Sequence, residues 1–437
     1  MKIGNAASFE IIKRLREAGF ASLYAGGCVR DMLLDIPCKD IDVVTDARPE
    51  QVRAVFGKTI EVGAQFGVTL VPLQGEIFEV ATFRIDGPSQ DGRHPDTVTY
   101  STDLEDAKRR DFTINGMFYD PVEEQVIDYV DGRQGIRDRI IRTIGDPLKR
   151  FHEDRLRMIR AVRFAARLGF TIDAGTAEAV KAMASQIDSV SRERVRDEIV
   201  KILTEGQAGR GFRLLKETGL LREVLPDVDA MDGVQQPPEY HPEGDVWQHT
   251  LKMLDLMTEP TETLALAVLF HDLGKPQTFK VRERIRFDRH DTVGASMTRR
   301  IMKNLRFPRK TVEWVESLVR EHLKFMNVDK MRPAKLKRFL SQDNFDEHLE
   351  LHRLDCLGSH GKLDKYEFCR RTLAEMPPEE LKPPRLVTGH DLIGLGLSPG
   401  PQFSDILKAV EDAQLEGRLK TQEEALEYIK IKWCHNL

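Results

Sequence analysis

The first 145 positions mix two hydrophobic periodicities. In residues 8–19 (SFEIIKRLREAG) the apolar positions recur every three to four residues, which predicts an amphipathic helix. Short runs rich in β-branched and aromatic residues predict strands at 22–25, 41–46, 68–73, 76–83 and 125–130. Glycine- and aspartate-rich segments separate these elements.

From residue 146 onward the strand patterns almost disappear, and helical periodicity continues along the chain. Proline-rich stretches interrupt this part at 237–242, 377–384 and 398–401. The pattern predicts an α+β fold, with a mixed head followed by an all-helical body. We place the domain boundaries at 1–145, 146–228, 229–375 and 376–437.

The 437 residues are too many for one compact core, which agrees with several domains. Apolar residues make up 41% and charged residues 31%, as in soluble globular proteins. No run of eighteen apolar residues is present, and the first residues lack the apolar segment of a secretory signal. The five cysteines form no C-x-x-C pair. We therefore expect a reduced, cytoplasmic protein without a membrane span.

The net charge of −5 hides an uneven distribution. Residues 137–167 contain ten lysines and arginines against four acidic residues. One basic face is enough to bind a phosphate backbone, so the overall charge does not exclude a nucleic acid partner.

Two carboxylates stand out in the head. Asp40 and Asp42 are two residues apart at a predicted strand, so both point to one face. Carboxylates held together repel each other unless a cation lies between them, and a pair of divalent metals suits nucleotidyl transfer. On its own, D-x-D more often marks two exposed acids. The preceding Gly26-Gly27 turn and Arg30 change this balance, because glycines and a helix start let a triphosphate approach the backbone.

These blocks, GGCVRDMLL (26–34) and KDIDVVT (39–45), resemble the nucleotide-binding signature of class II tRNA nucleotidyltransferases and bacterial poly(A) polymerases. RRDFTIN (109–115), EDRLR (153–157) and the lead-in at 136–151 are similar to further blocks of that family, in the same order. The resemblance covers roughly residues 20–170. It implies a polymerase-β-type nucleotidyltransferase head followed by a helical neck and body.

The resemblance also implies roles for single residues. Asp40 and Asp42 would be catalytic and bind Mg²⁺. The nucleotide would be bound by Gly27, Arg30, Arg110, Asp154, Arg157, Arg160 and Arg163. Within this set, Gly27, Arg30 and Arg110 would hold the triphosphate, and Asp154 and Arg157 would pair with the incoming base. The implied partners are tRNA, CTP and ATP; the sequence shows no protein partner.

Helical geometry supports part of this assignment. If residues 153–163 form one helix, Asp154 and Arg157 lie 60° apart and reach the same base. Arg160 lies a further 60° round, and Arg163 is half a turn from Asp154, so geometry alone favours them less than the family pattern does. Glu79 is either a third metal carboxylate or an outward-facing strand residue. The loop from Arg84 to Pro95 resembles the family's flexible loop, which is associated with the change to ATP.

A second constellation lies in the body: His249, His271, Asp272 and Asp355. An adjacent His-Asp pair in an apolar segment is unfavourable to bury unless a cation pairs with it. Two imidazoles and two carboxylates suit Mg²⁺, Mn²⁺ or Ni²⁺. LFHDLGKP (269–276) and the H…HD…D order resemble the HD-superfamily phosphohydrolases, which implies phosphodiesterase or phosphatase activity. His290 and His322 are either phosphate contacts nearby or structural histidines.

We therefore expect a Mg²⁺-dependent enzyme that adds C and A to tRNA 3′ ends, with an appended HD domain. An A-adding enzyme or a poly(A) polymerase shares every head motif and stays open. A third hypothesis is an HD phosphohydrolase with an inactive RNA-binding head, which the intact Asp40, Asp42 and Arg110 disfavour. A small-molecule nucleotidyltransferase is disfavoured by the block at 153–157 and the basic neck.

Overall fold

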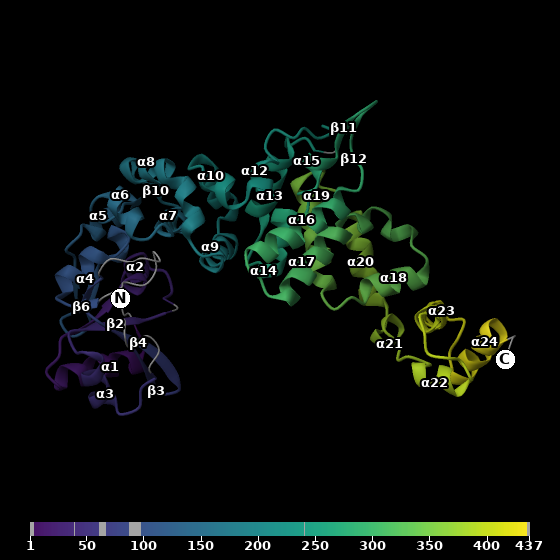
Figure 1. Cartoon of the computed structure of the whole chain (residues 1–437), viewed down its shortest axis with the longest axis horizontal. Coiled ribbons are helices and arrows are strands. Elements are labelled where there is room, and N and C mark those ends of the chain that lie inside the picture. Colours follow the sequence, from purple (N-terminus) through teal and green to yellow (C-terminus); the bar gives the residue numbers. More distant parts are fainter. Residues whose placement is uncertain (1–3, 39, 61–66, 87–97, 240, 435–437) are drawn as a thin grey trace. The chain divides into compact units, whose positions relative to one another are not determined.

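The computed structural model describes residues 4–38, 40–60, 67–86, 98–239 and 241–434. The chain forms two compact units (Figure 1). Unit 1 contains Met1–Asp229 and Asn304–Phe307, and unit 2 contains Ala230–Lys303 and Pro308–Leu437. Most of the loop from Arg84 to Pro95 lies outside the described residues. None of the helices in the described part of the chain is long and apolar enough to span a membrane.

A six-stranded sheet with the order β3-β4-β2-β1-β7-β8 forms the centre of the head. β2 is parallel to β4 and antiparallel to β1. The strands are β1 (Ser22–Ala25), β2 (Asp42–Thr45), β3 (Val68–Leu73), β4 (Glu76–Thr82), β7 (Phe118–Asp120) and β8 (Gln125–Ile127). Five of them were predicted from alternation. The sequence pattern missed β7, and also the separate pair β5 (Arg84–Asp86) and β6 (Val98–Tyr100).

Apolar residues cover both faces of the central strands. Tyr24 and Val43 pack into a core with α1 (Ala6–Glu17), α2 (Gly27–Leu33) and α3 (Pro49–Phe56). The opposite face buries a second cluster: Leu23, Ala25, Val44, Phe83, Ala107 and Phe118. Strands that are buried on both faces hold their ends in fixed positions. The polar residues at those ends are therefore rigidly placed.

The rest of unit 1 is mainly helical. Its helices are α4 (Asp103–Arg109), α5 (Gly132–Asp138), α6 (Pro147–Glu153), α7 (Arg157–Leu168), α8 (Ala174–Met183), α9 (Arg192–Thr204), α10 (Ala208–Glu217), α11 (Leu220–Val224) and α12 (Pro226–Asp229). The single helix expected through 153–163 is wrong. The chain leaves helical geometry at Asp154, whose backbone is extended at φ −148° and ψ 105°.

The part predicted to be helical, from residue 146 onward, is divided between the two units, and most of it from Ala230 onward forms unit 2. Helix α14 (Glu262–Phe270) is buried from Leu264 to Phe270, because its sequence is apolar all round. It packs against α13 (Val246–Leu256), α17 (Arg309–Glu321) and α19 (Phe345–Gly358). Other elements are α15 (Lys275–Thr278), α16 (His290–Asn304), η4 (His322–Lys330), α18 (Pro333–Leu340), α20 (Asp364–Glu375) and α21 (Pro378–Leu381).

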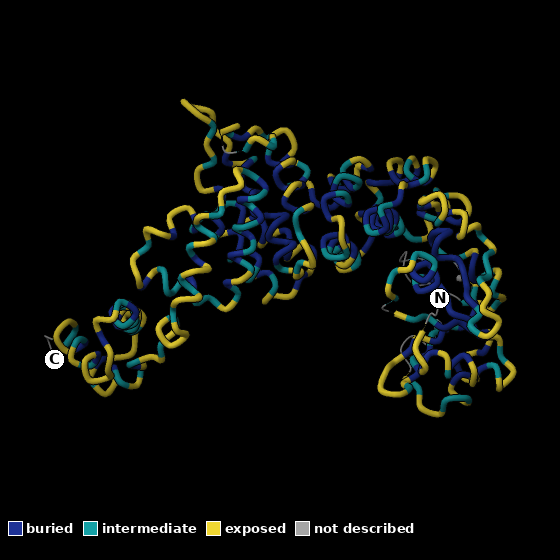
Figure 2. Tube along the Cα trace, turned by 180° about the vertical axis from the view of Figure 1, so that it is seen from behind, coloured by how far each residue is buried: buried dark blue, intermediate teal, exposed yellow. Residues whose placement is uncertain are grey.

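Two features of unit 2 stand apart from this bundle. The strands β11 (Phe279–Val281) and β12 (Ile285–Phe287) form an exposed hairpin that the sequence pattern did not predict (Figure 2). The last helices, α22 (Gly389–Gly394), α23 (Gln402–Leu415) and α24 (Gln422–Trp433), enclose their own apolar cluster around Leu392, Ile406 and Ile429.

Candidate active site and metal centre

Three carboxylates lie at one end of the head sheet. Asp42 is the first residue of β2, and Asp40 precedes it by two residues. The parallel pairing of β2 with β4 places Glu79 directly beside Asp42. Side chains in register on neighbouring strands share a face, so Glu79 belongs with the two aspartates. Sequence alternation had left Glu79 undecided, and the strand register supplies the missing information.

The electrostatics of this group favour a bound cation. Burial raises the pKa of Asp42 to about 6; Arg110 opposes this shift, while the carboxylates of Glu79 and Asp40 add to it. A buried carboxylate with acidic neighbours, such as Asp42, gains most when a hard divalent cation replaces its proton. The three acids therefore fit Mg²⁺.

The turn at Gly26 leaves room for the guanidinium of Arg110 beside the carboxylate of Asp42. Gly26 has φ +74°, and a Cβ there would lie 2.9 Å from Nη1 of Arg110 and 3.5 Å from Oδ2 of Asp42. Only glycine combines this backbone with such a close approach. Asp106 is fully buried and fixes Arg110 by accepting from Nε at 3.1 Å and Nη2 at 3.0 Å. Gly27 follows as the first residue of α2.

A buried network connects α2, the 109–115 block and α7. Arg30 is 2% exposed, pairs with Asp31 at 2.6 Å and donates to Oδ1 of Asn115 at 2.7 Å. Asn115 donates to Asp111 at 3.0 Å, and Arg160 donates to the other oxygen of Asp111 at 2.6 Å. Burial opposes ionisation of Asp111, but Arg160 and Asn115 lower its pKa to about 2. Arg30 is thus part of the interior, and its contact with a phosphate stays a prediction.

The break between α6 and α7 shapes the surroundings of Asp154. Its Oδ1 accepts from the N–H of Leu156 at 3.0 Å, and its Oδ2 accepts from Arg194 at 2.7 Å. Arg157, the first residue of α7, donates to Glu153 at 2.8 Å. Asp154 and Arg157 are therefore not 60° apart on one helix, as the sequence had predicted. They flank a turn, closed by a hydrogen bond from Arg157 N to the Asp154 carbonyl at 3.1 Å.

Further along α7 the arginines turn into the neck. Arg163 is 5% exposed, and Glu198 and Glu205 hold it at 2.6 and 3.0 Å. The side chain of Arg160 is 31% exposed and pairs with Asp111. Nucleotide contact by Arg160 or Arg163 stays a prediction.

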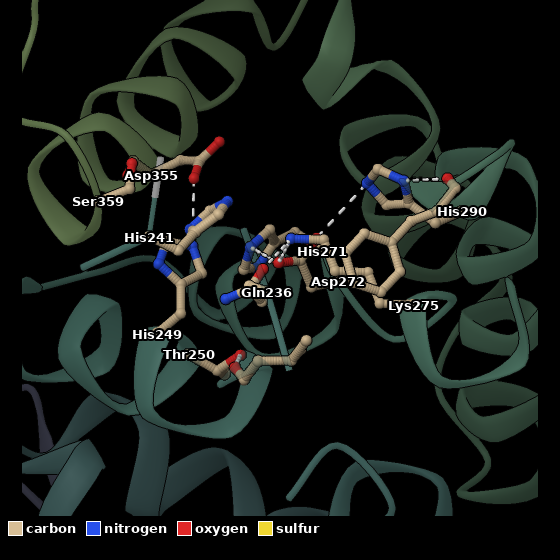
Figure 3. A network of polar contacts seen from close by, with 12 residues as sticks. Gln236, His241, His249, Thr250, His271, Asp272, Lys275, His290, Asp355 and Ser359 are labelled. Atoms are coloured by element: carbon tan, nitrogen blue, oxygen red, sulfur yellow. Dashed lines mark hydrogen bonds and ion pairs between the residues drawn. The ribbon is translucent and has the colours of Figure 1, made fainter. Parts of the chain in front are cut away.

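In unit 2 the predicted metal residues converge from three helices (Figure 3). His249 comes from α13, His271 ends α14 and Asp355 comes from α19. Nε2 of His249 lies 3.2 Å from Oδ1 of Asp355, and the two imidazole centroids are 5.3 Å apart. Ligand atoms of these three residues lie within 4.8 Å of one another.

Asp272 belongs to a second, adjacent group. It joins His290 and His322, whose Nε2 atoms are 3.2 Å apart, and its Oδ1 lies 3.5 Å from Nε2 of His290. Its Oδ2 lies 3.1 Å from Nε2 of His271 and 2.5 Å from Nζ of Lys275. The sequence predicted one set of four ligands. The structure places three of them together and Asp272 between that group and a pair of further histidines.

Two buried imidazole nitrogens indicate that this group of residues could bind a metal ion. Nε2 of His249 and Nε2 of His271 have no hydrogen-bond partner among the described residues. The Nδ1 atom of His271 is satisfied by the carbonyl of Val268 at 2.9 Å, which leaves Nε2 for a ligand. Two imidazoles that offer Nε2 beside the carboxylate of Asp355 suit a divalent transition metal, Mg²⁺ or Mn²⁺.

Sequence reasoning missed Glu243 and His241. The side chain of Glu243 is 6% exposed, and its Oε1 lies 2.7 Å from Nδ1 of His249 and 2.9 Å from Nδ1 of His241. Burial opposes protonation of His249, but Asp355 and Glu243 outweigh it and raise the pKa of His249 to about 9. The residues lie just before α13, where His241 is part of the proline-rich stretch 237–242 that we took for an interruption and Glu243 directly follows it. The H-x-E spacing next to His249 was the available signal.

We expect Glu243→Gln to lower the pKa of His249 by about one unit or more in metal-free protein, because an opposite charge within hydrogen-bond distance is removed. NMR titration of the histidine rings measures this value, with exposed Glu262→Gln as the control. Since the folded pKa of about 9 exceeds the ordinary 6.5, protonated His249 stabilises metal-free unit 2 fully below pH 6.5. That contribution is lost as pH rises to about 9, and earlier in the variant. An unchanged pKa would contradict the assignment.

Comparison with known proteins gives three domain matches. Residues 23–142 match the Poly A polymerase head domain, and 245–351 match the HD domain. Between them, 169–232 match the probable RNA and SrmB-binding site of polymerase A.

Several curated relatives are CCA-adding enzymes. The CCA-adding enzyme of Geobacillus stearothermophilus is 46% identical over 211 residues, which is 48% of this chain and 52% of that protein. The chain spans about half the length of the first curated relatives it matches, between 52% and 58%. The crystal structure of the Bacillus stearothermophilus CCA-adding enzyme in complex with CTP superimposes with a TM-score of 0.76 at 29% identity, covering 99% of this chain and 98% of that one.

The CCA-adding enzyme of Bacillus licheniformis extends this similarity through both units. It is 30% identical over 425 residues, which is 95% of each protein. Because that alignment includes the head, the neck and the HD domain together, the chain belongs to the family of CCA-adding enzymes.

Proposed function

We propose that this chain adds C and A nucleotides from CTP and ATP to the 3′ end of tRNA. The observation that carries the proposal is the convergence of Asp40, Asp42 and Glu79 beside Arg110 and the Gly26 turn. A relative with a TM-score of 0.76 was crystallised with CTP, which supports the choice of nucleotide. We assign residues 1–145 to the catalytic head, 146–228 to the neck, 229–375 to the HD domain and 376–437 to the tail.

Asp40, Asp42 and Glu79 would hold Mg²⁺, which stabilises the charge that develops on the transferring phosphoryl group. Arg110 binds the triphosphate with Gly27, whose position at the start of α2 allows a close backbone approach. Arg30 is buried beside them and donates to the side-chain oxygen of Asn115. The backbone carbonyl of Asn115 accepts from Nη1 of Arg110 at 3.4 Å, so Arg30 would help to position Arg110.

Asp154 and Arg157 select the base. A carboxylate accepts from an exocyclic amine, and a guanidinium donates to ring or carbonyl acceptors. Cytosine and adenine both carry such an amine, whereas uracil does not. Arg160 and Arg163 follow on α7 as further proposed nucleotide contacts, with Arg163 paired to Glu198 and Glu205 in the neck. The tRNA would be held through its phosphates.

The direct test is incubation with tRNA that lacks its 3′ nucleotides, with CTP, ATP or both, followed by sequencing of the products. Addition of A alone, or of long A tracts, would identify an A-adding enzyme or a poly(A) polymerase instead. Absence of any addition would leave the HD domain as the enzyme.

We expect Asp40→Ala and Asp42→Ala each to lower nucleotide addition by about 100-fold or more, since the metal supplies several kcal/mol of transition-state stabilisation. Glu79→Ala should also impair addition. Binding of tRNA should survive, because its phosphates are bound elsewhere. Exposed Asp46, just beyond β2, gives the matched control Asp46→Ala. Substantial turnover in both aspartate variants would contradict the metal assignment.

We expect Asp154→Ala to relax the choice of base more than it weakens triphosphate binding. A lost hydrogen-bond pair of this kind reduces discrimination by about 1–3 kcal/mol. The measurement is kcat/KM for all four triphosphates on one tRNA. Unchanged ratios among them would remove Asp154 from base selection.

A second activity is favoured by the buried Nε2 atoms of His249 and His271, which make no hydrogen bond among the described residues and each face a carboxylate oxygen. We propose that unit 2 is a metal-dependent phosphohydrolase acting on 2′,3′-cyclic phosphates. His249, His271 and Asp355 would hold one divalent ion (Mg²⁺, Mn²⁺ or Ni²⁺), which supplies an activated water. Asp272, His290 and His322 offer a second set of ligand atoms beside it.

We expect the double variant His271→Ala with Asp272→Ala to abolish hydrolysis of 2′,3′-cyclic AMP and to leave nucleotide addition largely intact. The assay supplies Mg²⁺, Mn²⁺ and Ni²⁺ in turn and measures bound metal. His360→Ala, an exposed histidine, is the control. A wild-type protein that neither binds metal in unit 2 nor hydrolyses the substrate would refute the second activity.

A further inference from the structure

The β11–β12 hairpin carries four positive charges. Its antiparallel register places Lys280 directly opposite Arg286. The N–H of Arg282 donates to the carbonyl of Arg284 at 3.2 Å, which extends the ladder by one pair. Because alternate residues of a strand point to opposite sides, Lys280 and Arg286 lie on the same face, and Arg282 and Arg284 add two cations in the turn that joins the strands.

The opposite face is apolar and attaches the hairpin to the metal centre. The rings of Phe279 and Phe287 lie 5.9 Å apart on this face. Phe287 also packs against Nζ of Lys275 at 5.3 Å and against the ring of His290 at 6.3 Å. Its carbonyl lies 2.9 Å from Nδ1 of His290. The base of the hairpin therefore borders the group formed by Asp272, His290 and His322.

The charge arrangement is unfavourable for the hairpin alone. Like charges directly opposite each other on neighbouring strands are destabilising. Lys280, Arg282, Arg284 and Arg286 are all exposed, and none of them forms an ion pair with a described residue. The hairpin projects from the body of unit 2 as an exposed element (Figures 1 and 2). Four exposed cations against the single acid Glu283 give the hairpin a net positive charge, which is the electrostatic footprint of a polyanion-binding surface.

We propose that this hairpin is an RNA-binding arm of the HD metal centre. It holds the backbone of a strand whose 3′-terminal 2′,3′-cyclic phosphate enters the centre. The proposal rests on the hydrolase function proposed above and names its substrate class: RNA ends, preferred over free cyclic mononucleotides. In the reaction, the oxygen of water forms a new P–O bond, one P–O bond to the ribose breaks, and a proton from the water passes to the released ribose oxygen, which becomes a hydroxyl. Water is the only co-reactant.

The test uses the full-length protein with the four cations changed together (Lys280→Gln, Arg282→Gln, Arg284→Gln and Arg286→Gln). A matched control replaces four exposed cations elsewhere in unit 2: Lys330, Arg332, Lys335 and Lys362, each to Gln. The substrates are 2′,3′-cyclic AMP and a short oligoribonucleotide that ends in a 2′,3′-cyclic phosphate. Fluorescence anisotropy of the labelled oligonucleotide against salt measures binding without catalysis.

We expect the hairpin variant to lose about tenfold or more in kcat/KM on the oligonucleotide and little on 2′,3′-cyclic AMP. The slope of log Kd against log salt should fall by about 2 to 3, because each phosphate contact on a single strand contributes about 0.7. The control variant should retain both values. Equal oligonucleotide turnover and equal salt slopes in wild type and hairpin variant would overturn the proposal, and an acidic protein surface would then fit the hairpin better.

Failure of the proposed hydrolase is distinguishable from failure of the arm. A wild-type protein that hydrolyses neither substrate refutes the hydrolase, and the arm as its accessory falls with it. A wild type that hydrolyses 2′,3′-cyclic AMP, with no difference between the two variants on RNA, refutes the arm alone.

Discussion

The head is organised around the carboxylate of Asp42, which is held where ionisation is unfavourable. Burial and the acids beside it raise its pKa to about 6, and Arg110 is the cation that opposes this shift. Arg110 can lie there because Gly26 has no side chain, and it is oriented by buried Asp106. The sheet supplies the rigidity that keeps these charges together, since both of its faces are packed. In the proposed function, Mg²⁺ would supply positive charge to the carboxylates, and the triphosphate would supply negative charge to Arg110.

In unit 2 the buried polar groups that need a partner are imidazoles. His249 and His271 are buried at the centre of a helical bundle, and each has one ring nitrogen fixed, by Glu243 and by the carbonyl of Val268. The other nitrogen of each ring points to the space shared with Asp355. A proton on His249 satisfies part of this arrangement in the metal-free state, which accounts for its raised pKa. Metal and proton therefore compete for the same atom.

The sequence predicted site residues where the signal lies in neighbouring residues, and did not decide those that depend on contacts between distant segments of the chain. Asp40 and Asp42 were predicted from the D-x-D spacing together with the nearby Gly26-Gly27 turn and Arg30, although β2 begins only at Asp42. His271 and Asp272 were predicted because an apolar segment surrounds them. Glu79 needed the pairing of β2 with β4, which joins residues far apart in the chain.

The errors have equally physical causes. The helix through Asp154 was wrong because neither glycine nor proline marks the break between α6 and α7. The β11–β12 hairpin was missed because its polar positions are charged, and charged residues weaken a strand signal.

The pairing of Asp154 with Arg194 at 2.7 Å has a consequence for selection. If Asp154 selects the base as proposed above, an incoming base would meet a carboxylate that already has a partner, so recognition would be an exchange and not a simple addition. A base with a suitable amine replaces the guanidinium and leaves the carboxylate satisfied. A base without one separates the pair and offers nothing in return, which costs a charged hydrogen bond. In that role Arg194 would be an internal competitor, which every nucleotide has to displace from the carboxylate before any chemistry begins.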